Sequence, residues 1–312
     1  MRIKTIHGDC HHHGWNCACA PVARVAPGEA LEFEVLEVTT GQIRPGSEAK
    51  DLLAIDNRLA NPLTGPIAID GAEPGDTLRV TVLEFEPSGW GWTGIIPGFG
   101  LLSDQFTEPV LHHWHYNRAP MQPTLFGDFA RVPLRPFPST IGVAPREPGP
   151  HNVLLAREKS AGNINIRQMI AGACLSVPVQ VQDALFSVGD IHAAQGDGEV
   201  CGSAIESPMS VSLRFDLVKQ EKLDAPMITS PPMTEGWVEA QGHEITTGIE
   251  TNLFSAARSA VSRMIDLLCK RYGLTATQAY MLCSVCGDLR ISSAVIVPHW
   301  VLTFHLPRAV LL

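Results

Sequence analysis

Short alternations of apolar and polar residues, separated by Gly and Pro, fill most of the first 218 residues. The clearest are PGEALEFEVLEV at 27–38 and PGDTLRVTVLEF at 74–85, where Pro-Gly and an acid precede an apolar residue at every second place. Side chains two residues apart share one face of a strand, so each stretch predicts a half-buried strand after a turn. The side chains predicted to be buried are Leu31, Phe33 and Val35 in the first stretch and Leu78, Val80 and Val82 in the second.

A fainter third copy of this pattern is GACLSVPVQV at 172–181. Pro178 interrupts it, and because Pro has no N–H to donate, we expect an edge strand or a bulge there. The copies are unequally spaced along the chain, which excludes a solenoid. The pattern therefore predicts a β-sandwich assembled from similar hairpins.

A helical pattern appears only late in the chain. From Leu253 to Leu268, apolar residues recur at i, i+4, i+7, i+8, i+11 and i+15, which predicts an amphipathic helix over about 252–272. Gly273 follows where a left-handed C-terminal cap belongs, and Thr275-x-x-Gln278 has the spacing of a capping box that begins a second helix. A strand pattern returns over 289–306, with Pro298 as an interruption.

These patterns divide the chain into two unequal parts. We expect a mostly β sandwich over residues 1–218, which carries the candidate site, and a smaller α+β portion over residues 219–312. The amphipathic helix needs no role beyond covering one face of a sheet.

Composition narrows the class of protein. The chain has 312 residues, of which 45% are hydrophobic and 18% charged, with 23 Lys+Arg against 32 Asp+Glu and a net charge of −9. Such a chain can bury a core and is not disordered. The acidic balance argues against nucleic acid or a membrane surface as partner, and no apolar stretch approaches the roughly 20 residues that cross a bilayer. Since the N-terminus also lacks the apolar segment of a secretion signal, we expect a cytoplasmic protein.

The densest polar cluster is SVGDIHAAQGDGEVCGSAIE at 187–206. Strand alternation places Asp190 and His192 on one face, and the glycines that follow allow Asp197 and Glu199 to fold back toward them. Imidazole and carboxylates together are the ligands of Zn²⁺ or of a harder divalent ion. The alternative is a Gly-rich turn whose acids only cap backbone N–H groups.

Other regions offer weaker candidates. HGDCHHHGWN at 7–16 holds a run of three histidines, and the tryptophans and histidines near 90 and 112–115 could line a pocket or simply pack together. The proline-stiffened loop ANPLTGP at 60–66 suits a ligand site or a plain corner. A Gly-x-Ser-x-Gly elbow and a Gly-rich phosphate loop are both absent from the sequence.

Several blocks of the chain resemble the acetamidase/formamidase family, in its order and over nearly the whole length. They are HHGWN (12–16), TTGQI (39–43), NPLTGPIAIDGAEPGDTLRV (61–80), GWGWTG (89–94), SVGDIHAAQGDGEVCGSAIE (187–206) and CGDLRISSAVIVP (286–298). The resemblance implies a jelly-roll-like β-sandwich followed by a smaller α+β portion. It also implies hydrolysis of the C–N bond of a small amide of the formamide or acetamide type to a carboxylate and ammonia, a divalent metal and a homo-oligomer.

Matching these blocks residue by residue also reveals departures from the family. Asn165 stands where the family usually has Asp, Asn16 where Asp is frequent, and Ile191 where Gly is usual. If the acids bind metal in the relatives, this chain binds it more weakly, binds another ion or acts on another substrate. The positions that fall on the family's polar site are His12, Asn163, Asp190, His192, Gln195, Asp197 and Glu199.

Our hypothesis is metal-assisted amide hydrolysis. A divalent ion, zinc first and calcium as the alternative, would polarise the carbonyl and lower the pKa of its bound water, toward ~7 for zinc. A carboxylate, Glu199 before Asp197, would take the water's proton and deliver it to the departing nitrogen. The predicted metal ligands are His192, Asp190 and His12, and the predicted substrate-binding residues are Asn163, Gln195, Trp92 and Asn61.

Two alternatives stay open. One is a non-catalytic β-sandwich that binds a small ligand through its Trp and His loops and holds a structural divalent ion. The other is a hydrolase of a cyclic amide or a carbamoyl compound.

Overall fold

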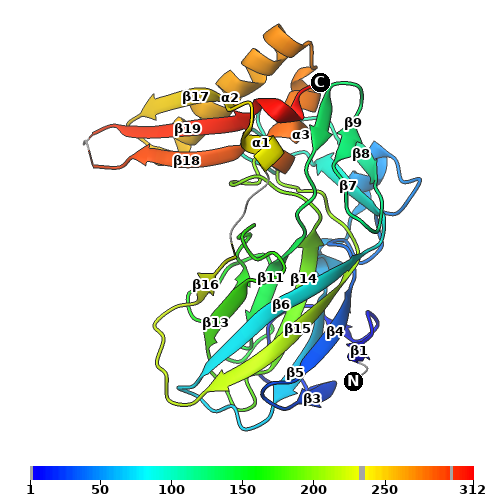
Figure 1. Cartoon of the computed structure of the whole chain (residues 1–312), viewed down its shortest axis with the longest axis vertical. Helices are drawn as coiled ribbons and strands as arrows, with labels where there is room; N and C mark the ends of the chain where they lie inside the picture. The colour runs from blue at the N-terminus through cyan, green and yellow to red at the C-terminus, as the bar shows by residue number, and fades with distance from the viewer. Residues whose placement is uncertain (1–2, 232–235, 296–297) are drawn as a thin grey trace.

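A computed structural model of the chain describes residues 3–231, 236–295 and 298–312, and the fold is mainly β (Figure 1). The lower part in this view is a jelly-roll-like β-sandwich, and the upper part is a smaller α+β portion. None of the helices in the described part of the chain is both long and apolar enough to cross a membrane.

The first sheet of the sandwich contains all three copies of the alternating pattern. They form β4 (Ala30–Val35), β6 (Thr77–Pro87) and β13 (Cys174–Pro178), and the side chains predicted to be buried in the first two copies are buried. The sheet order is β1 (Lys4–Ile6), β4, β15 (Met209–Val218), β6, β13 and β16 (Met227–Thr229). The predicted boundary at 218 thus falls before β16, which still belongs to this sheet.

Pro178 occupies a place where its missing N–H costs little. The short strand β16 pairs only with residues Cys174 to Ser176 of β13, so Pro178 lies beyond its end. On the other side β13 pairs with β6 up to Thr77. The sequence predicts an edge strand or a bulge at this proline. Because β16 is short, Pro178 has a strand neighbour on one side only, as a residue of an edge strand does.

The second sheet is more deeply buried than the first. Its order is β12 (Ala161–Asn163), β11 (Phe137–Val143), β14 (Phe186–His192), β5 (Leu63–Ile69) and β2 (His11–His12), with β3 (Ala23–Val25) also parallel to β5. Every residue of β5, β11 and β14 is buried. Phe186 of this sheet meets Phe33 and Phe215 of the first, with ring centroids 5.9 and 5.0 Å apart, which joins the two sheets in one core.

Shorter elements complete the chain before β11, and β7 (Trp90–Ile95), β8 (Val110–His115) and β9 (Thr124–Phe126) lie beside the C-terminal portion (Figure 1). A hairpin pairs β7 with β8, and a second pairs β9 with β10 (Ala130–Val132). The 3-10 turns η1 (Ala49–Ala54) and η2 (Asn57–Leu59) precede β5.

The C-terminal portion is a three-stranded sheet with helices on one face. Its order is β17 (His243–Glu250), β19 (Trp300–Pro307) and β18 (Asp288–Ser293), and α2 (Leu253–Tyr272) packs on it, followed by α3 (Ala276–Cys286). The short α1 (Gly236–Glu239) and η3 (Arg308–Val310) complete it. A Cβ on Gly248 of β17 would lie 1.8 Å from the carbonyl oxygen of Ala256, so α2 packs directly against the strand backbone.

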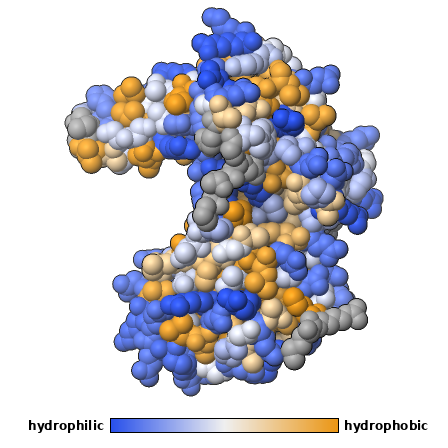
Figure 2. Space-filling model, in the orientation of Figure 1, coloured by the Kyte–Doolittle hydropathy of each residue, from blue (hydrophilic) through white to orange (hydrophobic). Residues whose placement is uncertain are grey.

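The predicted helix signals are confirmed. Gly273 ends α2 with φ 74°, and Thr275 begins α3 with both halves of a capping box. Pro298 falls between β18 and β19. The face of the sheet away from α2 exposes Ile245 and Ile249, and Figure 2 shows the hollow between this portion and the sandwich.

The loop over 193–203, which follows β14, connects the two portions. The Gly196 amide donates to the Ser284 carbonyl at 2.8 Å, and a Cβ on Gly196 would lie 1.8 Å from the Gly287 carbonyl oxygen. The Leu289 amide donates to the Asp197 carbonyl at 2.9 Å. Helix α3 and the start of β18 therefore hold the loop that carries much of the predicted site.

Candidate functional site

The end of β14 delivers two of the predicted ligands to one point. His192 Nε2 lies 3.1 Å from Asp190 Oδ1, and both side chains are buried. Asp190 has φ 51°, a left-handed conformation that a non-glycine residue in a strand rarely adopts. Such strain is typical of residues that are held in place for function.

A third carboxylate, from Glu206, completes this group. Its backbone pairs in both directions with Trp92 at 2.9 Å, and its Oε2 lies 3.1 Å from His192 Nε2. One oxygen or nitrogen from each of Asp190, His192 and Glu206 lies within 4.8 Å of the others, and we call these three residues the triad.

Glu206 was not among the predicted site residues, although it ends the 187–206 block. An acid directly after Ala204 and Ile205, both apolar, was the available signal, since a buried carboxylate needs a partner. Its place beside His192 depends on the loop that folds back between them, which residue spacing does not reveal.

Burial and mutual charge set the protonation of the triad. Burial raises the pKa of Glu206 to about 8, an effect that the charge of His192 opposes and that of Asp190 reinforces. Burial alone would lower the pKa of His192, but the carboxylates of Glu206 and Asp190 outweigh it and raise that pKa well above its usual value. For Asp190, burial acts upward, yet His192 and the hydrogen bonds hold its pKa below the ordinary value.

A second layer of hydrogen bonds orients the triad. Ser139 Oγ donates to Asp190 Oδ2 at 2.6 Å, and His192 Nδ1 lies 2.7 Å from Gln195 Oε1. Because an amide oxygen only accepts, Nδ1 carries a proton and Nε2 faces the two carboxylates. Gln195 Nε2 donates to the Asn165 carbonyl at 3.3 Å, so Gln195 supports the imidazole, while its predicted role in substrate binding stays a prediction.

A cavity of about 400 Å³ opens beside Asp190 and Glu206. The structure brings several predicted residues to its wall, although they come from separate segments of the chain. The predicted site residues that line it are Asn61, Trp92, Asn163, Asp190 and Glu199.

Glu199 lies in this wall with an unusual backbone and a shifted pKa. Its φ is 42°, and burial raises the pKa of its carboxyl to about 7, with His192 opposing and Asp190 adding to the shift. A carboxylate with a pKa near neutrality can exchange protons in both directions at physiological pH.

Two asparagine oxygens at the cavity have no hydrogen-bond partner. Asn61 donates its Nδ2 to Thr140 Oγ1 at 3.3 Å, and Asn165 donates its Nδ2 to Asn163 Oδ1 at 2.8 Å. The Oδ1 atoms of Asn61 and Asn165 are buried and unpaired. Because an unsatisfied buried acceptor is costly, these oxygens are suited to accept N–H groups from a ligand.

Trp92 is held against the cavity by a buried carboxylate. Its Nε1 donates to Glu37 Oε2 at 3.0 Å, and Glu37 also accepts from Thr39 and from the Gly41 amide. None of the histidines at 112–115 lines the cavity. His112 and His113 pack against aromatic rings, and His113 stacks on Trp90 with centroids 5.9 Å apart. Among the predicted aromatic candidates, Trp92 is the one that reaches the site.

His12 is placed outside the triad. Its Nε2 lies 2.9 Å from Ser187 Oγ and its Nδ1 3.0 Å from the Gly14 carbonyl, so hydrogen bonds occupy both nitrogens. The structure does not bring His12 into the triad. Its role as a metal ligand stays a prediction that this geometry does not favour.

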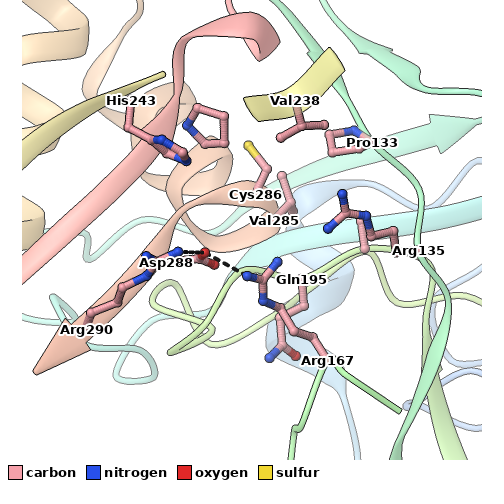
Figure 3. A pocket seen from close by; sticks show the side chains of 12 residues that line it. Pro133, Arg135, Arg167, Gln195, Val238, His243, Val285, Cys286, Asp288 and Arg290 are labelled. Carbon is pink, nitrogen blue, oxygen red and sulfur yellow. Dashed lines mark hydrogen bonds and ion pairs between the residues drawn. The ribbon is translucent and has the colours of Figure 1, made fainter. Parts of the chain in front are cut away.

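Asp197 is not among the residues that line the cavity, and its partner Arg167 lines a different pocket together with Gln195 and Asp288 (Figure 3). Asp197 Oδ1 accepts from Arg167 at 3.0 Å, and Arg167 also donates to Asp288 at 2.7 Å. The sharp turn at Gly196 sends the chain toward α3, so Asp197 points away from the cavity that Glu199 lines. Its predicted catalytic role has no support from this placement.

Comparisons with known proteins extend over nearly the whole chain. The profile of the acetamidase/formamidase family matches residues 3–154 and 152–311. The chain is 27% identical to an acetamidase of Mycolicibacterium smegmatis, over 90% of this chain and 86% of that protein. It is 28% identical to a formamidase of Methylophilus methylotrophus, over 96% of this chain and 89% of that protein.

Solved structures share the fold. A gamma lactamase from Delftia acidovorans superimposes with a TM-score of 0.88 at 24% identity, covering 97% of this chain and 89% of that one, a likeness of fold. An acetamidase from Bacillus halodurans gives a TM-score of 0.66 at 27% identity and covers 97% of each chain.

Proposed function

Since the chain belongs to the acetamidase/formamidase family and is an amidase acting on carbon–nitrogen bonds other than peptide bonds, we propose that it hydrolyses a small amide in the cavity beside the triad. The products are a carboxylate and ammonia. The observation that carries this proposal is the buried His192 between two carboxylates, at a cavity that also holds Glu199.

Glu199 is the proposed general base. An amide resists water because its carbonyl is weakly electrophilic and its nitrogen leaves poorly. A carboxylate with a pKa of about 7 takes a proton from the attacking water and returns it to the departing nitrogen. Glu199 must therefore act first as a base and then as an acid. A carboxyl group with a pKa near neutral pH can do both.

Asn61 and Asn165 are the proposed partners of the substrate's NH₂ group. Their unpaired Oδ1 atoms accept hydrogen bonds from it, and so orient the amide toward the triad. Asn165 stands where relatives usually carry Asp, and its neutral amide oxygen still accepts. Asn163 anchors Asn165 through the 2.8 Å bond between their side chains.

The triad has the donor set of a divalent metal. Two carboxylates and an imidazole whose Nδ1 is held by an amide oxygen are typical of zinc sites, and the buried Glu206 Oε2 makes its polar contact with His192. Asp190, His192 and Glu206 would hold the ion. A bound divalent metal supplies carbonyl polarisation and a water of lowered pKa. We propose zinc, with calcium as the alternative.

Ammonia release tests the proposal. The purified protein is assayed with formamide, acetamide and propionamide as prepared, after chelation, and after readdition of Zn²⁺, Mn²⁺ or Ca²⁺, with metal content measured in each sample. We expect release that falls at least tenfold on chelation and returns with one ion. Unchanged release after complete metal removal would refute the metal and leave Glu199 acting on water alone.

The same assay separates the alternatives. If no amide releases ammonia with any ion, while chelation unfolds the protein, the chain is a ligand-binding sandwich with a structural ion. A cyclic amide or a carbamoyl compound is the second candidate substrate, because the cavity of about 400 Å³ exceeds what formamide fills. Both compounds therefore belong in the panel.

We also propose a homo-oligomer and a cytoplasmic location, as expected from the sequence. The exposed Ile245 and Ile249 on the uncovered face of the C-terminal sheet support assembly, because burying them against another copy removes apolar surface from water. Light scattering on the purified protein measures the mass; a monomer at micromolar concentration would refute the assembly.

A further inference from the structure

Part of the cavity wall is apolar. Its side chains come from the segments that follow β4 and η1, from β7 and the loop after it, and from the segment between β11 and β12. The apolar side chains of this wall are Val38, Ile55, Trp92, Ile96, Phe99 and Leu154.

Two of these side chains are exposed although they line the cavity. Phe99 is 53% and Leu154 46% accessible to solvent. Phe99 packs over Gly202, where a Cβ would lie 2.6 Å from its ring, so the ring is seated and does not merely project into solvent. A ligand that extends from the triad toward this wall would bury both side chains.

The size of the cavity exceeds what the simplest amides need. Allowing about 30 Å³ for each water-sized group, the four heavy atoms of acetamide fill roughly 120 Å³. The cavity holds about 400 Å³. Acetamide at the triad would therefore leave the apolar wall in contact with water.

The charge of the lining selects against anions. Asp190, Glu199 and Glu206 supply three carboxyl groups, while no Lys or Arg is found among the cavity-lining residues of the described chain. A negatively charged substituent on the apolar wall would lose its water without a Lys or Arg to pair with.

We propose that the preferred substrate is a neutral carboxamide whose acyl group is an apolar chain or ring of about four to six carbons, bound with its amide at the triad and its hydrocarbon on the wall of Phe99 and Leu154. The proposal rests on the proposed amide hydrolysis and specifies its substrate class. Water exclusion by the hydrocarbon is the source of the preference.

A chain-length series tests it. Values of kcat/KM from ammonia release are compared for formamide, acetamide, propionamide, butyramide, pentanamide and hexanamide. We expect a rise of up to about fourfold for each added methylene as far as pentanamide, since each one leaves water for the wall. A maximum at formamide or acetamide would overturn the proposal and leave amide hydrolysis standing. Failure to hydrolyse any member in the presence of metal would instead refute the proposed function.

The effect of a negative charge on the substrate is tested with two amides of similar shape, succinamate and butyramide. Succinamate carries a carboxylate where butyramide has its terminal methyl group. We expect kcat/KM for succinamate to be at least tenfold lower, because its carboxylate would leave water for the apolar wall, where no Lys or Arg lines the cavity. Equal or better turnover of succinamate would contradict the neutral class.

Two variants test whether Phe99 and Leu154 contact the acyl chain of the substrate. In Phe99→Ala and in Leu154→Ala, the ratio of kcat/KM for pentanamide to that for acetamide should fall by about fivefold or more, because each variant removes hydrocarbon that the longer substrate covers. Leu125→Ala is the matched control, since Leu125 is 60% exposed on β9 and does not line the cavity. An unchanged ratio in both wall variants would overturn the proposal even if the series rises.

Discussion

Glu199 combines three properties that no other acid of the cavity has together. It lines the cavity, its backbone is left-handed, and its pKa is raised to about 7 chiefly by burial. Asp197, two residues earlier, is instead paired with Arg167 at 3.0 Å. Two residues of the same loop therefore have different surroundings: Glu199 lines the cavity, where it can transfer a proton, and Asp197 is held in an ion pair with Arg167.

Replacing Glu199 by Gln keeps the shape and removes the base. We expect kcat to fall about 10²- to 10⁴-fold with a small change in KM, the range for loss of a general base. The exposed Glu108→Gln is the control and should keep wild-type turnover. Ordinary kcat in Glu199→Gln would remove this residue from the mechanism.

The pH profile reports the same group. Only deprotonated Glu199 can accept a proton, and its pKa is about 7, so kcat/KM should rise with pH between about 6 and 8. Stopped assays with one preferred amide in overlapping buffers would measure it. A flat profile across this interval would show that a different group controls the reaction.

The positions of some site residues could be predicted from the sequence, and those of others could not. Asp190 and His192 were paired correctly by strand alternation alone, because their spacing of two residues is local. Glu206 reaches them only through the return of a loop, and His12 misses them because Ser187 and Gly14 hold its ring. Those placements depend on contacts between distant segments.

At the scale of elements, the alternation of apolar and polar residues predicted the strands that have one exposed face. β4 and β6 were predicted with their buried sides. β5 and β11 are buried along their whole length, so their sequences lack that alternation and gave no comparable signal. The capping box of α3 was visible because it depends on residues three positions apart.

The contact of β17 with α2 gives a prediction at this scale. Gly248→Ala would place a methyl group 1.8 Å from the Ala256 carbonyl, so the helix must shift. We expect the free energy of unfolding to fall by about 1–3 kcal/mol, the usual cost of overpacking. Thr247→Ala, on the exposed face next to it, should change stability by less than about 0.5 kcal/mol. Urea titration followed by circular dichroism measures both.

At the scale of the whole molecule, the site depends on both portions. The triad belongs to the sandwich, yet the loop that continues to Glu199 is held by the backbone of α3 and β18. We call the contact of Gly196 with Gly287 the joint between the two portions. The sequence predicts a boundary near 218 but does not reveal this joint, because neither glycine has a side chain whose pattern could indicate a contact.

Gly196→Ala tests the joint. Its Cβ would lie 1.8 Å from the Gly287 carbonyl oxygen, so the loop has to move away from α3 and carry Gln195 with it. We expect a loss of about 1–3 kcal/mol of stability together with a fall in kcat/KM of at least tenfold. The control Ala194→Gly removes a buried methyl group nearby without a clash. Normal turnover in a stable Gly196→Ala protein would separate the joint from catalysis.

The same joint has a consequence for biosynthesis. A ribosome releases the strands of the sandwich well before it has made Ser284, Gly287 and Leu289, whose backbone groups support the loop after β14. A nascent chain can thus close its two sheets while that loop still lacks its backing. Hydrolytic competence is then expected only after Leu289 has left the ribosome and can pair with the loop.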